Sequence, residues 1–325
     1  MSTLVRLALE AMGTRFELVM HGGDDGLLRA AGEEAFAEIA SLDRQLSRFD
    51  RASEISWINA HAAETPVVVE PRLFGLLDRC QHVSAATGGA FDITVGALLQ
   101  AWCVAQQTAS CGARLDAATW DAARGAVGFE HLQLDPARRT VAFARRGLTI
   151  DLGAAGKGYA IDAAVAVLRD CGVSHALIHG GTSSVYGLGL SPDGTDWLIA
   201  WDGTGDTRRS FALRDGALSV SAAHGKAFTV DGQQFGHVMD PRRGRPATAA
   251  DAAVVTGPGA FECDALSTAL LVLGASWAPA LRATFPGYDG AAGPAATSGR
   301  PLDVAASSSL RRKFHGTGRS WIVAR

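Results

Sequence analysis

The stretch IDLGAAGKGYAID, residues 150–162, places three glycines and a lysine directly after an apolar run. Glycine lets backbone N–H groups approach an anion closely, and the N-terminus of a following helix adds partial positive charge. This composition favours phosphate binding. The spacing fits neither the P-loop G-x-x-x-x-G-K-[ST] nor the dinucleotide pattern G-x-G-x-x-G. From these residues alone, a tight strand-to-helix turn that holds no ligand is an equal alternative.

A second candidate is the pair Asp264 and Thr268 in ECDALSTALLVLG. On a helix this spacing places a carboxylate and a hydroxyl on one face. Oxygen ligands of this kind suit Mg²⁺, which is bound by one or two carboxylates together with phosphate oxygens and water. The alternative is structural: an aspartate favoured by the helix dipole, and a threonine that bonds back to a carbonyl.

Three further residues have side chains that could take part in catalysis or ligand binding. His237, in FGHVMDPRRGRP, precedes an Asp-Pro turn and can take a proton from a hydroxyl near neutral pH, although most single histidines only satisfy local hydrogen bonds. Phe49, in LSRFDRASEISWIN, offers a ring that can cover a planar ligand. Asp92, in TGGAFDITVGALLQAW, can hold a loop together with Thr94. The alternative for the last two is a core aromatic beside ordinary turns.

The elements that must position these residues follow from hydrophobic spacing. The N-terminus alternates apolar and polar residues and predicts a first strand. Helices are expected at 26–47, at 71–87, after the glycine turn up to Cys171-Gly172, and at 261–273 up to Gly274. Strands are expected within 131–151, before the glycine turn, at 175–181 and within 185–240. The Gly/Ala/Pro/Ser-rich segment 286–309 predicts a loose connection.

The composition is that of a globular chain: 325 residues, 47% hydrophobic and 19% charged. A net charge of −3 gives no basic surface for nucleic acid. No apolar run reaches the roughly 18 residues of a membrane span, and the N-terminus has neither an export signal nor a lipidation cysteine. Five cysteines without a C-x-x-C pair indicate buried free thiols and a cytoplasmic protein. No linker divides the chain, so one domain over 1–325 is expected, with two subdomains left open.

Taken in order, seven segments closely resemble the FAD:protein FMN transferases, the ApbE-like flavin transferases. They are AMGTRFEL, LSRFDRASEISWIN, TGGAFDITVGALLQAW, IDLGAAGKGYAIDAA, ALIHGG, GHVMDPRRGRPA and DALSTALLVLG, within residues 11–274. The resemblance implies an α/β (α+β) fold of mixed, largely antiparallel sheets flanked by helices. It also implies magnesium-dependent cleavage of FAD, with FMN joined by a phosphoester to a Thr or Ser of an acceptor protein and AMP released.

The resemblance further implies a role for each candidate residue. The glycine turn, with Gly153, Gly156, Lys157 and Gly158, would cradle the FAD pyrophosphate, and a main-chain carbonyl of Ala155 or Gly156 would bind the metal ion. Asp264 and Thr268 match the metal-binding side chains, and His237 matches the histidine that would activate the acceptor hydroxyl. Other contacts with FAD are expected at Met12, Gly13, Thr14, Phe49, Asp92, Gly180, Gly181 and Ser221.

The chain departs from the family pattern at positions where contacts with the flavin or the substrate are expected. Where the family has N-x-G-G-D, this chain has LIHGGTS, with His179 and Thr182 at the changed positions. Where the family has T-S-G, this chain has SVSAAHG, which keeps Ser221. The family's G-G-I-A-K-G turn is replaced by GAAGKG. Two alternatives therefore stay open: an FAD pyrophosphatase that uses water as acceptor, and a flavin-binding protein without turnover. The joint presence of Asp264, Thr268 and His237 argues against the second.

Overall fold

The centre of the fold is a seven-stranded sheet in which every neighbouring pair of strands is antiparallel. The structure, a computed structural model, describes residues 4–109, 117–202, 208–223, 228–230, 233–235, 238–293 and 303–305. In spatial order the strands are β1 (Leu4–Ala11), β2 (Thr14–His21), β6 (Ala176–Gly180), β7 (Ser184–Leu188), β10 (Gly216–Ala222), β15 (Ala252–Gly257) and β16 (Asp289–Gly293). The sheet therefore joins segments from the beginning, middle and end of the chain.

The first two strands form a hairpin, where the alternating pattern predicts one strand. Ala11 pairs with Thr14, so only Met12 and Gly13 form the turn. Both have positive φ, 51° and 67°. This is the conformation of a type I′ turn, whose twist suits antiparallel strands and which favours glycine at its second position.

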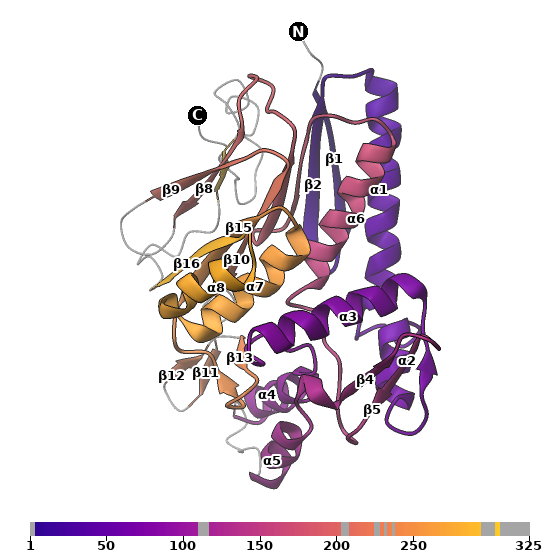
Figure 1. The fold of residues 1–325 in the computed structure, drawn as a ribbon, viewed down its shortest axis with the longest axis vertical. Helices are drawn as coiled ribbons and strands as arrows, with labels where there is room; N and C mark the ends of the chain where they lie inside the picture. The colour runs from indigo at the N-terminus through magenta and orange to yellow at the C-terminus, as the bar shows by residue number, and fades with distance from the viewer. Residues whose placement is uncertain are drawn as a thin grey trace.

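Three long helices cover one face of the sheet: α1 (Asp25–Leu46), α6 (Gly156–Asp170) and α7 (Ala260–Leu273). Figure 1 shows α1 and α6 side by side; α1 lies against β1 and β2, α6 against β6 and β7, and α7 against β10 and β15. Large apolar side chains such as Phe16, Ile39, Ile161 and Phe261 fill the core between sheet and helices. Burial of one such side chain contributes about 1.5–3 kcal/mol.

The opposite face of the sheet is covered by a smaller antiparallel sheet. Its strands, in spatial order, are β17 (Asp303–Ala305), β8 (Trp197–Asp202) and β9 (Arg208–Leu213). Successive strand residues point to opposite faces. Accordingly, Leu177 and Val254 pack with Trp197 in a second core cluster. Their neighbours Ile178 and Val255 belong to the core between the sheet and the three long helices.

The remaining elements lie mainly at the lower end of the molecule in Figure 1. They comprise α2 (Glu54–His61), α3 (Pro71–Ala86), α4 (Gly96–Ala109), α5 (Ala117–Gly125) and a sheet of β3 (Val67–Val68), β5 (Thr140–Phe143) and β4 (Leu132–Asp135). Shorter pieces are β11 (Phe228–Val230), β12 (Gln233–Phe235), β13 (Met239–Asp240), β14 (Arg245–Pro246), α8 (Ala278–Thr284) and 3₁₀ turns at Phe129–His131 and Ala275–Trp277. The expected class, helices with mixed and largely antiparallel sheets, is confirmed.

The predicted helices are confirmed, and their ends have identifiable caps. Asp24 accepts a hydrogen bond from the Leu27 N–H at the start of α1. Glu70 accepts the N–H groups of Arg72 and Leu73 at the start of α3. Gly172 follows the end of α6 and has a φ of 78°. Gly274 follows the end of α7 and has a φ of 82°. The boundaries follow from local chemistry, which is why the sequence predicts them.

The strand expected before the glycine turn is not present in the structure, which corrects that prediction. Thr149 makes a single isolated bridge with Val95, and residues 150–152 belong to no ladder. The N–H and C=O of Ile150 bind the side-chain amide of Asn59 at 2.7 and 3.0 Å. An asparagine side chain thus takes the place of a neighbouring strand.

Two other expectations differ from the structure. The segment 286–309 contains β16 and β17, while 294–302 and 306–309 lie outside the described residues. Among the described cysteines, Cys80 and Cys263 are buried but Cys103 and Cys171 are exposed. The expectation of buried thiols is therefore correct for only half of them.

No single helix among the described residues has the length and apolar character needed to cross a membrane. The segments Ala260–Leu273 and Ala275–Thr284 pass such a test only together, as a pair bent by 120°. The first of these is α7, which is largely buried in the core.

Gly158 sets how closely α6 and α7 pack. A Cβ atom on Gly158 would lie 2.2 Å from the carbonyl oxygen of Ala260 and 2.8 Å from the Cβ of Asp264. Backbone atoms of a packed helix cannot move aside as a flexible side chain can. Glycine is therefore required here for steric reasons.

We expect Gly158→Ala to lower the free energy of unfolding by about 3 kcal/mol or more, because it forces the two helices apart. Chemical denaturation measures this. The control is Gly75→Ala on α3, where an added Cβ meets nothing within 4 Å; there alanine should stabilise by about 0.5–1 kcal/mol. Equal effects of the two substitutions would contradict this packing argument.

Candidate functional site

The candidate site centres on the carboxylate of Asp264 in α7, whose exposed fraction is only 3%. Its Oδ2 accepts the Gly158 N–H at 3.0 Å and lies 3.7 Å from the Lys157 ammonium. Its Oδ1 lies 3.3 Å from the Ser184 hydroxyl and 3.2 Å from that of Ser219. A buried carboxylate needs such partners. The glycine turn and Asp264, distant in sequence, are therefore in contact.

The Lys157 ammonium lies between two oxygen acceptors. Besides its ion pair with Asp264, it donates to the carbonyl of Gly153 at 3.2 Å. A positive charge thus occupies the space between a main-chain carbonyl and a carboxylate. Oxygen groups in this arrangement are the donors that Mg²⁺ prefers.

Hydroxyl groups extend the polar cluster along α7 toward β10. The Thr268 hydroxyl lies 3.4 Å from the main-chain carbonyl of Asp264. Ser221 on β10 lies 3.1 Å from the Thr268 hydroxyl and 2.8 Å from that of Ser267. The structure therefore brings three predicted site residues together: Asp264, Thr268 and Ser221.

The two helices at the site cap each other. Neither Ala155 before α6 nor Gly259 before α7 supplies a side-chain cap. Instead, Asp264 accepts the Gly158 N–H of α6, and Asp162 of α6 accepts the N–H groups of Ala260 and Phe261 at 2.8 and 2.9 Å. Burial raises the pKa of the Asp162 carboxyl, and these backbone hydrogen bonds oppose that shift.

Backbone bonds already engage the proposed main-chain metal ligands at the start of α6. Ala155 is buried, and its carbonyl accepts the Tyr159 N–H at 3.0 Å. The Gly156 N–H donates to the Leu152 carbonyl at 2.7 Å. A metal ion at either carbonyl would use its second lone pair.

A chain of contacts connects the glycine turn to Phe49. The Gly153 N–H donates to Asp151 at 2.7 Å, and Asp151 forms an ion pair with Arg48. The Arg48 guanidinium lies 4.3 Å from the centroid of the Phe49 ring. Because 81% of Phe49 is exposed, it is not a core aromatic, and its ring is open to a ligand.

Asp92 holds a loop together with Thr94, as predicted from the sequence. Its carboxylate accepts the N–H and the O–H of Thr94, at 2.8 and 2.7 Å, and the N–H of Phe129 at 2.8 Å. Burial raises the pKa of Asp92, although these hydrogen bonds favour its charged form. Both carboxylate oxygens are therefore committed to the loop, and a direct contact with FAD remains a prediction.

The first hairpin meets the expected glycine pair. The Gly181 N–H donates to the Arg15 carbonyl at 2.9 Å, and a Cβ on Gly181 would lie 2.2 Å from the Thr14 hydroxyl. Gly180 pairs with Ser184, whose hydroxyl approaches Asp264. The hairpin end of β6 and β7 thus connects the predicted contacts around Thr14 with the buried carboxylate.

His237, the predicted catalytic residue, and His224 lie outside the described residues. Within the part of the chain that the structure describes, no group of three or more His, Cys, Asp or Glu side chains is placed to hold a metal ion. Sequence reasoning missed Arg48, Asp151, Asp162, Ser184 and Ser219. Arg48, Asp151, Asp162 and Ser219 lie inside segments quoted above, but each of the five residues also has a partner that is distant in sequence.

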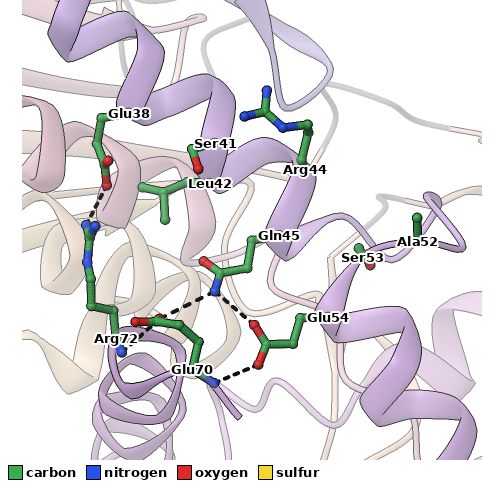
Figure 2. A pocket seen from close by; sticks show the side chains of 10 residues that line it. All are labelled: Glu38, Ser41, Leu42, Arg44, Gln45, Ala52, Ser53, Glu54, Glu70 and Arg72. Carbon is green, nitrogen blue, oxygen red and sulfur yellow. Dashed lines mark hydrogen bonds and ion pairs between the residues drawn. The ribbon is translucent and has the colours of Figure 1, made fainter.

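A polar groove of about 410 Å³ lies elsewhere, between α1, α2 and the start of α3 (Figure 2). In Figure 2, Gln45 bridges the carboxylates of Glu54 and Glu70, and Arg72 pairs with Glu38. None of its lining residues belongs to the predicted site. The groove is therefore a separate surface feature.

These observations define an α+β protein whose central antiparallel sheet supports a buried carboxylate at the junction of two helices. Residues 12–289 match the profile of the ApbE family. The chain therefore belongs to the ApbE family, and the recognition made from the seven sequence segments is confirmed.

Individual relatives agree with this assignment. The chain is 30% identical to a FAD:protein FMN transferase of Treponema pallidum, over 81% of this chain and 76% of the relative. It is 29% identical to the FAD:protein FMN transferase of Klebsiella pneumoniae, over 84% and 79%. Among solved structures, the Pseudomonas stutzeri flavinyl transferase ApbE, apo form, is 25% identical, with a TM-score of 0.75 and coverage of 90% and 95%.

The pair Glu17 and His179 yields a testable pH dependence. These residues face each other across β2 and β6, with 3.6 Å between His179 Nε2 and the Glu17 carboxylate. The hydrogen bond with His179 is the largest cause that lowers the pKa of Glu17. A carboxyl with a lowered folded-state pKa stabilises the fold above its unfolded-state pKa, and this stabilisation is lost as the pH falls through the folded-state value.

We therefore expect His179→Leu to raise the pKa of Glu17 and to move acid unfolding to higher pH. A ¹³C carboxyl titration by NMR measures the first effect, and circular dichroism during acidification measures the second. His82→Leu, at an exposed position on α3, is the control and should change neither. An unaltered Glu17 titration in His179→Leu would show that the pair is not coupled.

Proposed function

We propose that this protein transfers FMN from FAD to the hydroxyl of a Thr or Ser in an acceptor protein, with Mg²⁺ required and AMP released. The observation that carries the proposal is the contact between the glycine turn and the buried Asp264 carboxylate, through the Gly158 N–H at 3.0 Å and Lys157 at 3.7 Å. The relatives known as FAD:protein FMN transferases support the transfer of FMN from FAD to a protein.

The residues present fit a magnesium ion. Asp264 and Thr268 would hold it together with a main-chain carbonyl of Ala155 or Gly156, and all of these donors are oxygen atoms. The Lys157 ammonium already lies between oxygen atoms of Gly153 and Asp264, where a cation is favourable. When bound, the ion would spread the charge of the pyrophosphate oxygens.

The protein's own groups would bind and orient FAD. The turn from Gly153 to Gly158 would hold the pyrophosphate, with Lys157 as a mobile cation that can turn toward it. Phe49 offers an exposed ring face for a planar ring system. Met12 to Thr14, Gly180, Gly181 and Ser221 would line the rest of the FAD site, and the substitutions His179 and Thr182 would tune its preference.

The transfer step balances without a further reactant. The oxygen of the acceptor hydroxyl bonds to the phosphorus of the FMN half, and the bond from that phosphorus to the bridging oxygen breaks. The bridging oxygen leaves with AMP. His237 would accept the hydroxyl proton, because an imidazole titrates near neutral pH. The Thr or Ser of the acceptor and the cytoplasmic location expected above stay predictions.

The decisive experiment incubates the protein with FAD and Mg²⁺, with and without lysate of the source organism. Transfer gives a fluorescent, covalently flavinylated band on a denaturing gel together with AMP. FMN and AMP without a labelled band would indicate hydrolysis, and FAD recovered intact would indicate simple binding. Either of these results would overturn the proposal.

We expect Asp264→Asn to reduce transfer by on the order of 10²-fold at limiting Mg²⁺, because it removes the charged metal ligand but keeps the side-chain shape. Removal of divalent ions with EDTA should abolish transfer by the parent protein, and added Mg²⁺ should restore it. The control is Asp78→Asn on α3, at an exposed carboxylate. Parental turnover by Asp264→Asn would exclude this residue as the metal ligand.

We expect His237→Ala to bind FAD almost as the parent does but to transfer FMN about 10²–10⁴-fold more slowly, the range for loss of a general base. Equilibrium binding monitored by flavin fluorescence and single-turnover transfer separate the two effects. If the variant transferred FMN at the parental rate, His237 would have a structural role, and Asp240 and His224 would be tested next.

A further inference from the structure

Asp162 performs a function that no motif of the sequence suggests. It lies one helical turn after Gly158 on α6, so the two residues share the face that meets α7. Its two carboxylate oxygens accept the N–H groups of Ala260 and Phe261, at 2.8 and 2.9 Å. These are the first two residues of α7, and Gly259 before them has no side chain to cap the helix.

Asp264 lies one turn into the helix that Asp162 caps. Its location relative to Gly158 therefore depends on where the first turn of α7 is held. The steric limit at Gly158 fixes the distance between the helices, but a steric contact alone does not stop α7 from sliding or fraying at its end. The paired hydrogen bonds to Asp162 supply that restraint.

We propose that Asp162 is a positioning residue that sets the affinity of the Asp264 site for a divalent cation. This inference rests on the proposed function, because it takes Asp264 as the metal ligand. Asp162 itself does not touch the cation. By anchoring the N-terminus of α7 to α6, it holds the Asp264 carboxylate against the Gly158 N–H and in register with the main-chain carbonyls of the glycine turn.

The test measures Mn²⁺ binding by electron paramagnetic resonance, in the absence of FAD and of turnover. We expect Asp162→Asn to bind Mn²⁺ about 10–100-fold more weakly than the parent, the range found when a residue that orients a metal ligand is lost. Asp162→Glu, whose carboxylate can still accept N–H groups but lies one methylene further from α6, should fall between the two. Hydrogen exchange should become faster at the amides of Ala260 and Phe261 in both variants.

Glu70→Gln is the matched control. Glu70 also accepts two backbone N–H groups at a helix start, those of Arg72 and Leu73 at 2.9 and 3.0 Å, but it caps α3. This variant should lose stability in the same manner and keep parental Mn²⁺ affinity. An equal loss of Mn²⁺ affinity in Glu70→Gln and Asp162→Asn would reduce the role of Asp162 to general stability and overturn the proposal.

Asp264→Asn separates this inference from the function on which it rests. If Asp264→Asn loses Mn²⁺ binding while Asp162→Asn binds as the parent does, the positioning role is wrong and the metal site stands. If Asp264→Asn binds Mn²⁺ as the parent does, the metal site itself is wrong. If Asp162→Asn does not fold, Asp162→Glu supplies the same comparison, and parental affinity in that variant with faster exchange at Ala260 would equally overturn the positioning role.

Discussion

The arrangement of the site depends on the carboxylate of Asp264 being buried at the start of another helix. A carboxylate with 3% exposure is stable only if its oxygens are hydrogen-bonded. Gly158 provides an N–H because α6 begins there, and it must be glycine because the backbone of α7 lies so close. The positive end of the α6 dipole faces the same carboxylate. One buried charge thus explains the helix crossing, the glycine and the hydroxyls of Ser184 and Ser219.

The glycine turn itself is held from the opposite side by groups of the N-terminal third of the chain. Asn59 binds the backbone of Ile150, and Asp151 joins the turn to Arg48. The backbone adds the bond from the Asp151 N–H to the Ile93 carbonyl, at 2.7 Å. Side-chain and backbone bonds therefore both hold the segment before the turn, and the Lys157 ammonium lies between Gly153 and Asp264.

Helices and the family were predictable because their signals are local or occur in a fixed order. Apolar spacing, together with Pro71 and Gly274 for two of them, places three helices to within one residue at each end. The two-residue turn at Met12 was missed because a positive φ at methionine has no sequence signal, and alternation continues across the turn. The caps by Asp162 and the hydroxyls around Asp264 were missed because they connect positions 45 to 106 residues apart in sequence. Spacing within a segment carries no information about such pairs.

Two of the departures from the family pattern, at His179 and Thr182, occupy a different part of the candidate site from the retained Asp264 and Thr268. Asp264, Thr268 and Gly158 lie where α6 meets α7, whereas His179 and Thr182 lie at the hairpin end of β6 and β7. A change at the helix junction would leave a buried charge without partners, which is costly. A change at the strand ends can be absorbed locally, as His179 shows by pairing with Glu17 across the sheet. The constraint on the buried Asp264 carboxylate therefore does not extend to these two positions.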